Sequence, residues 1–142
     1  VLSFLLTNGF PYAERTALKG GHDTGDITGT PGVCWQVKGG EQAHKASDLD
    51  IETWMAELHK QTANSAHAEL GVLVVKRSGY GKQRAGDWWA YLSQGTLLRL
   101  GLNGTYDTKL HLLPDWLEAV PLRMHLRDAV RLLRWTGYGD PL

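Results

Sequence analysis

The residues best suited to chemistry lie between Gly20 and Lys38, where acidic, amide and lysine side chains surround a glycine-containing turn. Asp26 begins one short segment, and the tripeptide Gln36-Val37-Lys38 ends an apolar run. An antiparallel pair of strands joined through residues 30–32 would bring Asp26, Gln36 and Lys38 together. Side chains alternate along a strand, so Gln36 and Lys38 should share a face. This layout is typical of a metal-dependent phosphodiesterase site.

Phosphodiester hydrolysis brings an anionic nucleophile to an anionic phosphate, and a divalent metal offsets much of that charge. Mg²⁺ prefers hard oxygen ligands, which the Asp26 carboxylate, the Gln36 side-chain carbonyl, the Val37 backbone carbonyl and waters could supply. Mn²⁺ should substitute for Mg²⁺. Lys38 would place a positive charge beside the attacking water and the phosphate, stabilising the transition state. We therefore assign Lys38 the central catalytic role.

These residues resemble the PD-(D/E)xK nuclease superfamily, whose signature is an aspartate after a turn and a Glu-x-Lys tripeptide on the next strand. An acidic residue on the preceding helix completes that signature. The resemblance implies that Asp26, Gln36, Val37 and Lys38 form the site, with Glu14 as an additional or water-mediated metal ligand.

The likeness extends to the small Holliday-junction-resolvase-like proteins of actinobacteria and their phages, over roughly Phe10 to Ser93. It is carried by Pro11-Tyr12-Ala13-Glu14-Arg15, Gly25-Asp26-Ile27, Gly29 and the strand ending at Lys38. It implies a restriction-endonuclease-like α/β fold with a central mixed sheet flanked by helices, a homodimer, branched DNA as substrate and Arg15 as a DNA contact.

Gln36 departs from those relatives, which usually carry glutamate at this position. The amide removes one negative charge, so metal affinity should fall. Related nuclease branches do use Gln-x-Lys, and glutamine is also the usual replacement for trapping an uncleaved complex.

Composition sets outer limits on this interpretation. The 142 residues, 42% of them hydrophobic, suffice for one soluble domain with its own core. Fifteen basic residues balance fifteen acidic ones, so a nucleic acid would have to be bound by a local basic patch. The single Cys34 argues against an internal disulfide and favours a reducing cytoplasm, which the resemblance implies to be that of a bacterial cell or a phage-infected host. We expect Cys34 to be buried.

Two further patterns limit the interpretation. The apolar start Val1–Leu6 is shorter than a membrane span and lacks the features of a signal peptide, so we expect a strand or a packing arm. The six histidines show no ligand spacing such as His-Glu-x-x-His, and zinc is not expected.

The patterning predicts alternating helices and strands. The expected elements are a helix over 12–19, strands over 25–29 and 33–38, a polar loop over 39–46, a helix from the capping box Ser47-x-x-Asp50 to about residue 70, a central strand over 71–75 and a final strand over 87–92. Residues 1–93 would form the nuclease core. Residues 94–142 would form a C-terminal helical extension, with helices over 115–120 and 122–135.

Three other side chains are secondary candidates. Asp23 could replace or assist Asp26, although its position next to the Gly20-Gly21 helix end favours a capping or turn role. Glu57 and Gln61 lie one helical turn apart at the border of an apolar stripe, where they could face the site, although the pattern favours a solvated helix face.

Basic side chains form two clusters. The first cluster surrounds a glycine-rich loop and consists of Lys76, Arg77, Lys82 and Arg84. This loop either binds DNA phosphates or is a solvated hairpin loop without a ligand. Tyr80 within it could stack on an exposed base. The second cluster, Arg123, Arg127, Arg131 and Arg134, should form one stripe of a helix. That stripe would follow a phosphate backbone, pair with a partner subunit or remain solvated.

The sequence therefore predicts a Mg²⁺-dependent endodeoxyribonuclease acting on branched DNA. Two alternatives stay open: a nuclease for flaps, nicks or forks, and a non-catalytic DNA-binding module with a weakened metal site.

Overall fold

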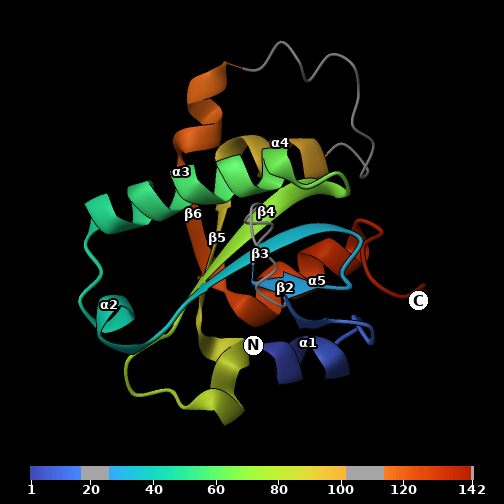
Figure 1. Ribbon diagram of the computed structural model, residues 1–142, viewed down its shortest axis with the longest axis horizontal. Helices are drawn as coiled ribbons and strands as arrows, with labels where there is room; N and C mark the ends of the chain where they lie inside the picture. The colour runs from blue at the N-terminus through green and yellow to red at the C-terminus, as the bar shows by residue number, and fades with distance from the viewer. Residues whose placement is uncertain (17–25, 102–113, 142) are drawn as a thin grey trace.

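The chain folds into a mixed six-stranded sheet with helices on both faces (Figure 1). The computed structural model describes residues 1–16, 26–101 and 114–141. The strands follow the chain order across the sheet. They are β1 (Glu14–Arg15), β2 (Ile27–Thr28), β3 (Gly32–Lys38), β4 (Ala68–Val75), β5 (Trp89–Ser93) and β6 (Pro121–His125). Neighbouring strands are antiparallel except β3 and β4, which are parallel. The protein thus has a mixed α/β fold, as the sequence predicts.

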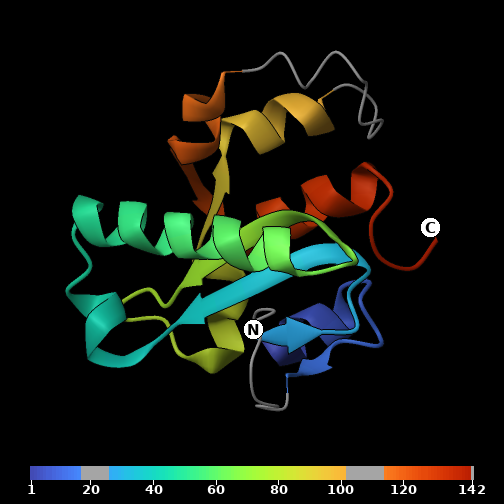
Figure 2. The same cartoon turned by 45° about the horizontal axis from the view of Figure 1, so that its top comes forward.

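The helices divide between the two faces of the sheet. They are α1 (Leu2–Thr7), α2 (Gly40–His44), α3 (Asp48–Asn64), α4 (Gln94–Leu100) and α5 (Leu126–Trp135), with 3₁₀ turns η1 (Lys82–Asp87) and η3 (Asp115–Ala119). A parallel pair needs a crossover connection, and α2 and α3 provide it between β3 and β4. α3 crosses one face of the sheet, while α1 and α5 lie against the other (Figure 2). Among the described residues, no helix has the length and apolar character needed to cross a membrane.

Alternation along β3 and β4 divides the core between the two faces. On the α3 face, Cys34 and Leu73 pack against α3, whose buried residues there are Ile51, Trp54, Met55 and Leu58. On the opposite face, Trp35 and Val72 belong to a second cluster that includes residues of α1 and α5. Cys34 is buried, as expected.

The start of α3 follows the predicted capping box. Ser47 Oγ accepts a hydrogen bond from the Asp50 backbone N–H at 3.1 Å, and Asp50 Oδ2 accepts one from the Ser47 N–H at 2.9 Å. The helix ends earlier than expected, at Asn64, because the chain already enters β4 at Ala68. The expected strands over 33–38 and 71–75 are confirmed within β3 and β4. The expected polar loop over 39–46 instead contains the short helix α2.

The N-terminal expectations are wrong in two places. The predicted helix over 12–19 is absent as far as Thr16, and residues 17–19 lie outside the described part of the chain. Glu14 and Arg15 instead form β1, which pairs with β2. Tertiary pairing has overridden a weak helical propensity. The expected strand or arm at the start is the helix α1.

The C-terminal segment belongs to the same sheet and core, so the expected separate helical extension is wrong. β5 is not the final strand, because β6 pairs along its outer side. The expected helix over 122–135 is divided into β6 and α5, and the one over 115–120 is the 3₁₀ turn η3. Leu126 and Leu133 of α5 are fully buried in the cluster that contains Trp35. The boundary placed after residue 93 therefore does not separate two structural units among the described residues.

We expect Leu133→Ala to lower the free energy of unfolding by about 2–5 kcal/mol, because it leaves a cavity in the shared core. Trp135→Ala, on the same helix but with the tryptophan 85% exposed, is the control and should cost less than about 0.5 kcal/mol. Urea unfolding measures both. A loss below 1 kcal/mol for Leu133→Ala would contradict the placement of α5 in the core.

Candidate functional site

Three polar side chains meet where β3 passes under α3. Gln36 and Lys38 lie on the same face of β3, as alternation predicts, and Glu57 reaches them from α3. Gln36 Nε2 donates a hydrogen bond to Glu57 Oε2 at 3.3 Å, and Lys38 Nζ lies 3.8 Å from the same oxygen. Trp54, one turn earlier on α3, lies under the Lys38 ammonium, 5.4 Å from Nζ to the ring centroid.

Asp26 joins this group from the segment just before β2. Its Oδ2 accepts a hydrogen bond from the Val37 backbone N–H at 2.6 Å. Lys38 O accepts from Lys76 N on the β4 side, and successive residues of a strand direct their peptide groups to opposite sides. The Val37 carbonyl therefore points to the side of β3 where Asp26 lies. The expected antiparallel pairing of β2 with β3 is confirmed, and it places Asp26 beside Gln36 and Val37.

Gln36 leaves one polar atom without an internal partner. The residue is only 5% exposed, and among the described residues nothing hydrogen-bonds its side-chain oxygen Oε1. The bond from Nε2 to Glu57 fixes which end of the amide is the oxygen. Burying a carbonyl without a partner costs free energy, so this oxygen calls for a donor or a cation that the described residues do not supply.

Stability alone does not account for this arrangement. The Glu57 side chain is half exposed, and an ion pair of that kind contributes about 0–1 kcal/mol. The Lys38 side chain is mostly buried, at 17% exposure, so its charge is held in place at a cost in solvation.

The site offers oxygen ligands rather than a ready-made cluster of acids. Among the described residues, no three His, Cys, Asp or Glu side chains are grouped closely enough to hold a metal ion. A cation here would depend on the amide oxygen of Gln36 and the backbone carbonyl of Val37 together with the Asp26 and Glu57 carboxylates. Hard divalent cations accept such mixed oxygen ligands.

Other expected site residues lie elsewhere. Glu14 is on β1 and not on a helix, and β2 separates it from β3, so it is about 10 Å across the sheet from Gln36. Arg15 neighbours it on the same exposed strand. Asp23 lies outside the described residues. α1 carries no acidic residue, and the second carboxylate of the site comes from Glu57 instead.

The sequence did not assign Glu57 to the site, because periodicity places it at the edge of the apolar stripe, where a side chain can face either the site or solvent. The rotation of α3 about its axis as it packs on β3 determines which of the two Glu57 faces. Gln61, one turn later, is buried.

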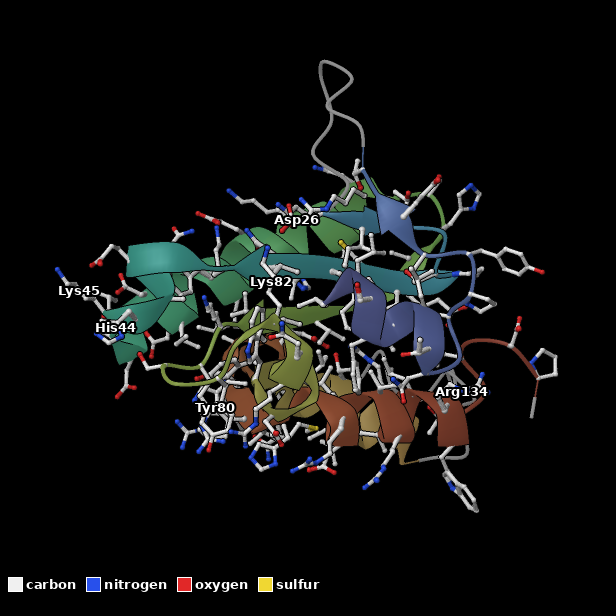
Figure 3. All side chains as sticks on the ribbon, turned by 90° about the horizontal axis from the view of Figure 1, so that it is seen from below. Asp26, His44, Lys45, Tyr80, Lys82 and Arg134 are labelled. Atoms are coloured by element: carbon white, nitrogen blue, oxygen red, sulfur yellow. The ribbon has the colours of Figure 1, made fainter. Side chains whose placement is uncertain are left out.

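The first basic cluster is organised by aromatic rings, in contacts that we call the arginine–aromatic stack. The stack runs through Arg84, Tyr80, Arg77, Trp89 and Arg123 in that order. Each guanidinium carbon lies 4.1–4.3 Å from the centroid of a neighbouring ring. Figure 3 shows the nitrogen-bearing side chains gathered around Tyr80.

The two lysines of that cluster are not part of the stack. Lys76 directs its ammonium over Trp88, 6.0 Å from the centroid, and Lys82 is exposed at the start of η1. A hydrogen bond between His44 and Ser78 ties the segment after β3 to the loop after β4. That loop is thereby held near the end of β3, where Lys38 lies.

The second arginine cluster is not one helical stripe. Arg123 lies on β6, so it belongs to the arginine–aromatic stack. Arg127 pairs with Asp87 at 2.7 Å, and Arg131 pairs with Asp128 at 3.6 Å. Arg134 donates to the backbone carbonyls of Gly9, Tyr138 and Asp140, so its role is structural.

Comparisons of the chain with protein-family models, with curated proteins and with solved structures find no match. The interpretation of the site therefore rests on its own geometry.

We expect Asp26→Ala to lower the free energy of unfolding by about 1 kcal/mol, because the Val37 N–H loses its acceptor. Asp26→Asn keeps an acceptor oxygen in the same position and should cost less than half as much. Chemical denaturation of both variants measures the difference. Equal losses would show that the hydrogen bond to Val37 does not account for the effect.

Proposed function

We propose that this protein is a metal-dependent endodeoxyribonuclease of restriction-endonuclease-like fold that acts on branched DNA. One observation carries the proposal. The amide oxygen of Gln36 is buried without a partner among the described residues, next to the Asp26 and Glu57 carboxylates and the Lys38 ammonium. The mixed sheet supports the resemblance seen in the sequence, because β2, which directly follows Asp26, pairs antiparallel with the strand that carries Gln36-Val37-Lys38.

The residues present fit a divalent cation such as Mg²⁺ or Mn²⁺. The Gln36 oxygen, the Val37 carbonyl, one Asp26 oxygen and one Glu57 oxygen would hold it. A bound cation would supply Lewis-acid charge to a phosphate and lower the pKa of a water. Because Gln36 contributes no charge, the site should hold the cation more weakly than a site with glutamate in its place.

Lys38 would act on the phosphate directly. Its ammonium is held by Glu57 and by the ring of Trp54, so the charge is positioned before substrate arrives. A fixed cation next to developing negative charge stabilises the transition state without reorganisation. Glu57 would orient both Lys38 and the Gln36 amide.

The branched substrate and the homodimer come from the resemblance alone, since cutting a junction symmetrically needs two sites. A nuclease for flaps, nicks or forks would use the same chemistry. Cleavage of a series of branched substrates would separate these activities.

One observation favours a second candidate, a DNA-binding module without catalysis. Gln36 and Lys38 both contact the Glu57 carboxylate, so part of its negative charge is already neutralised by the protein and is less available to a metal ion. Such a module would bind DNA equally well with Mg²⁺ or with chelator, and would leave it intact.

The test is cleavage of an end-labelled four-way junction and a matched linear duplex, with Mg²⁺, Mn²⁺ or EDTA. We expect metal-dependent paired nicks in the junction. Lys38→Ala should slow cleavage by about 100-fold or more while sparing junction binding. Gln36→Glu should cleave at lower Mg²⁺ concentration than the wild type. Lys60→Ala, which removes an exposed lysine of α3, is the matched control and should cleave normally.

Equal cleavage by the wild type and Lys38→Ala would remove Lys38 from the mechanism. Cleavage only by Gln36→Glu would indicate a nuclease disabled at its metal site. Binding without cleavage by every variant would favour the DNA-binding module.

A further inference from the structure

Two rows of cross-strand neighbours connect the candidate site to the arginine–aromatic stack. The first row is Lys38, Val75, Trp89 and His125, and the second is Gln36, Leu73, Tyr91 and Arg123. Directly paired residues in a sheet point to the same face, so both rows lie on the α3 face. α3 covers the middle of the rows, where Leu73 and Val75 are buried. Lys38 therefore lies at one end of this face and Arg123 at the other.

The separation between the two ends suits a nucleic acid strand. Gln36 and Arg123 are three strand spacings apart, about 14 Å. Phosphates of one DNA strand advance about 3.4 Å along the helix axis per nucleotide, so the gap corresponds to roughly four nucleotides. The loop after β4, which carries Arg77 and Tyr80, lies beyond the strand end next to Lys38 and bridges the two ends.

The stack concentrates positive charge that the described residues neutralise only in part. Arg77 and Arg84 share the ring of Tyr80, and Arg77 and Arg123 share the ring of Trp89. Among the described residues, Arg77 and Arg123 form no ion pair with a carboxylate, whereas Arg84 pairs with Asp87 at 3.6 Å. Arg77 and Arg123, which share the Trp89 ring, repel each other, and a bound anion would offset that repulsion.

The neighbours of the stack help to hold Arg123 in place. Burial raises the pKa of the Tyr91 hydroxyl, while the charge of Arg123 and its hydrogen bond to that hydroxyl act in the opposite direction. Asp48, at the start of α3, is close enough for its charge to act on Tyr91 as well. Trp89 stacks on His125, with ring centroids 5.3 Å apart and planes 14° from parallel.

We propose that the arginine–aromatic stack binds backbone phosphates of a nucleic acid strand, a few nucleotides from the bond cleaved at Lys38. This inference rests on the proposed function for the identity of the polymer. A guanidinium group laid on an aromatic ring directs its N–H groups outward from the ring, and that planar fork matches phosphate oxygens. Nη1 of Arg77 lies 3.4 Å from both the Asp87 carbonyl and His125 Nε2, and Arg123 contacts the Tyr91 hydroxyl, so each arginine would offer its remaining N–H groups to phosphate. Because the rings already contact arginines, the stack recognises charge and spacing and not the identity of bases.

The test is binding of fluorescently labelled DNA in EDTA, measured by anisotropy over a range of salt concentrations, so that cleavage plays no part. Arg123→Gln should weaken binding several-fold and make the slope of log K against log salt shallower by about 0.9 for duplex DNA. Trp89→Leu should weaken binding in the same direction by removing the ring that holds Arg77 and Arg123. Arg131→Gln, which removes an exposed arginine of α5, is the matched control and should bind like the wild type. Circular dichroism would confirm that all variants are folded.

Equal weakening by Arg123→Gln and Arg131→Gln would overturn the proposal, since binding would then depend only on overall charge. Displacement of DNA by polyglutamate as effectively as by unlabelled DNA would also overturn it, in favour of an acidic protein partner. Arg123-dependent binding by a protein that never cleaves DNA would support the stack and refute the nuclease. Cleavage with the same KM in every arginine variant would support the nuclease and refute the stack.

Discussion

The parallel pairing of β3 with β4 is the constraint on which the rest of the structure depends. It runs along β3 to Lys38, which lies opposite Val75, and it requires the crossover that places α3 over the sheet. α3 in turn brings Glu57 to Gln36 and Lys38. The same register continues through β5 to β6, which aligns Arg123 with Gln36 on one face. A slip of one residue would turn Gln36 and Lys38 to the opposite face and separate both groups from α3.

Two groups of polar side chains on this face lack full compensation among the described residues, and each favours a different kind of ligand. At β3, an acceptor oxygen of Gln36 is buried beside two carboxylates, without a donor from the part of the chain that the structure describes, which favours a small cation. At β5 and β6, arginines lie against aromatic rings without enough carboxylates to neutralise them, which favours an extended anion. A polynucleotide with its bound divalent cation would satisfy both groups at once. That complementarity is the main physical reason to prefer a nucleic acid as the ligand of this face.

Local signals in the sequence predicted the elements whose causes are local. The capping box of Ser47 and Asp50, and the apolar run of β4, were sufficient to place α3 and the strand that follows it. The sequence did not predict the strands that form only because they pair with a neighbouring strand. Glu14 and Arg15 favour helix yet form β1 beside β2, and residues 121–125 carry helix-forming Leu, Arg and Met yet form β6 beside β5. The sequence likewise predicted that Asp26, Gln36 and Lys38 would come together, but it did not assign Glu57 to the site. The direction in which the edge of a helix faces depends on how the helix packs against the sheet. Arg123 was placed on a helix for want of any local strand signal.

The central claim is that Asp26, Gln36 and Glu57 together hold a divalent cation, and terbium luminescence excited through tryptophan tests it most directly. Trp54 lies against Lys38, close enough to sensitise an ion bound at this site. The account predicts luminescence that saturates with added Tb³⁺, that Mg²⁺ and Mn²⁺ displace, and that strengthens in Gln36→Glu. Glu57→Gln should lose most of the signal, while Glu52→Gln, an exposed glutamate on the same helix, should keep it. Equal luminescence from Glu57→Gln and the wild type would contradict the account.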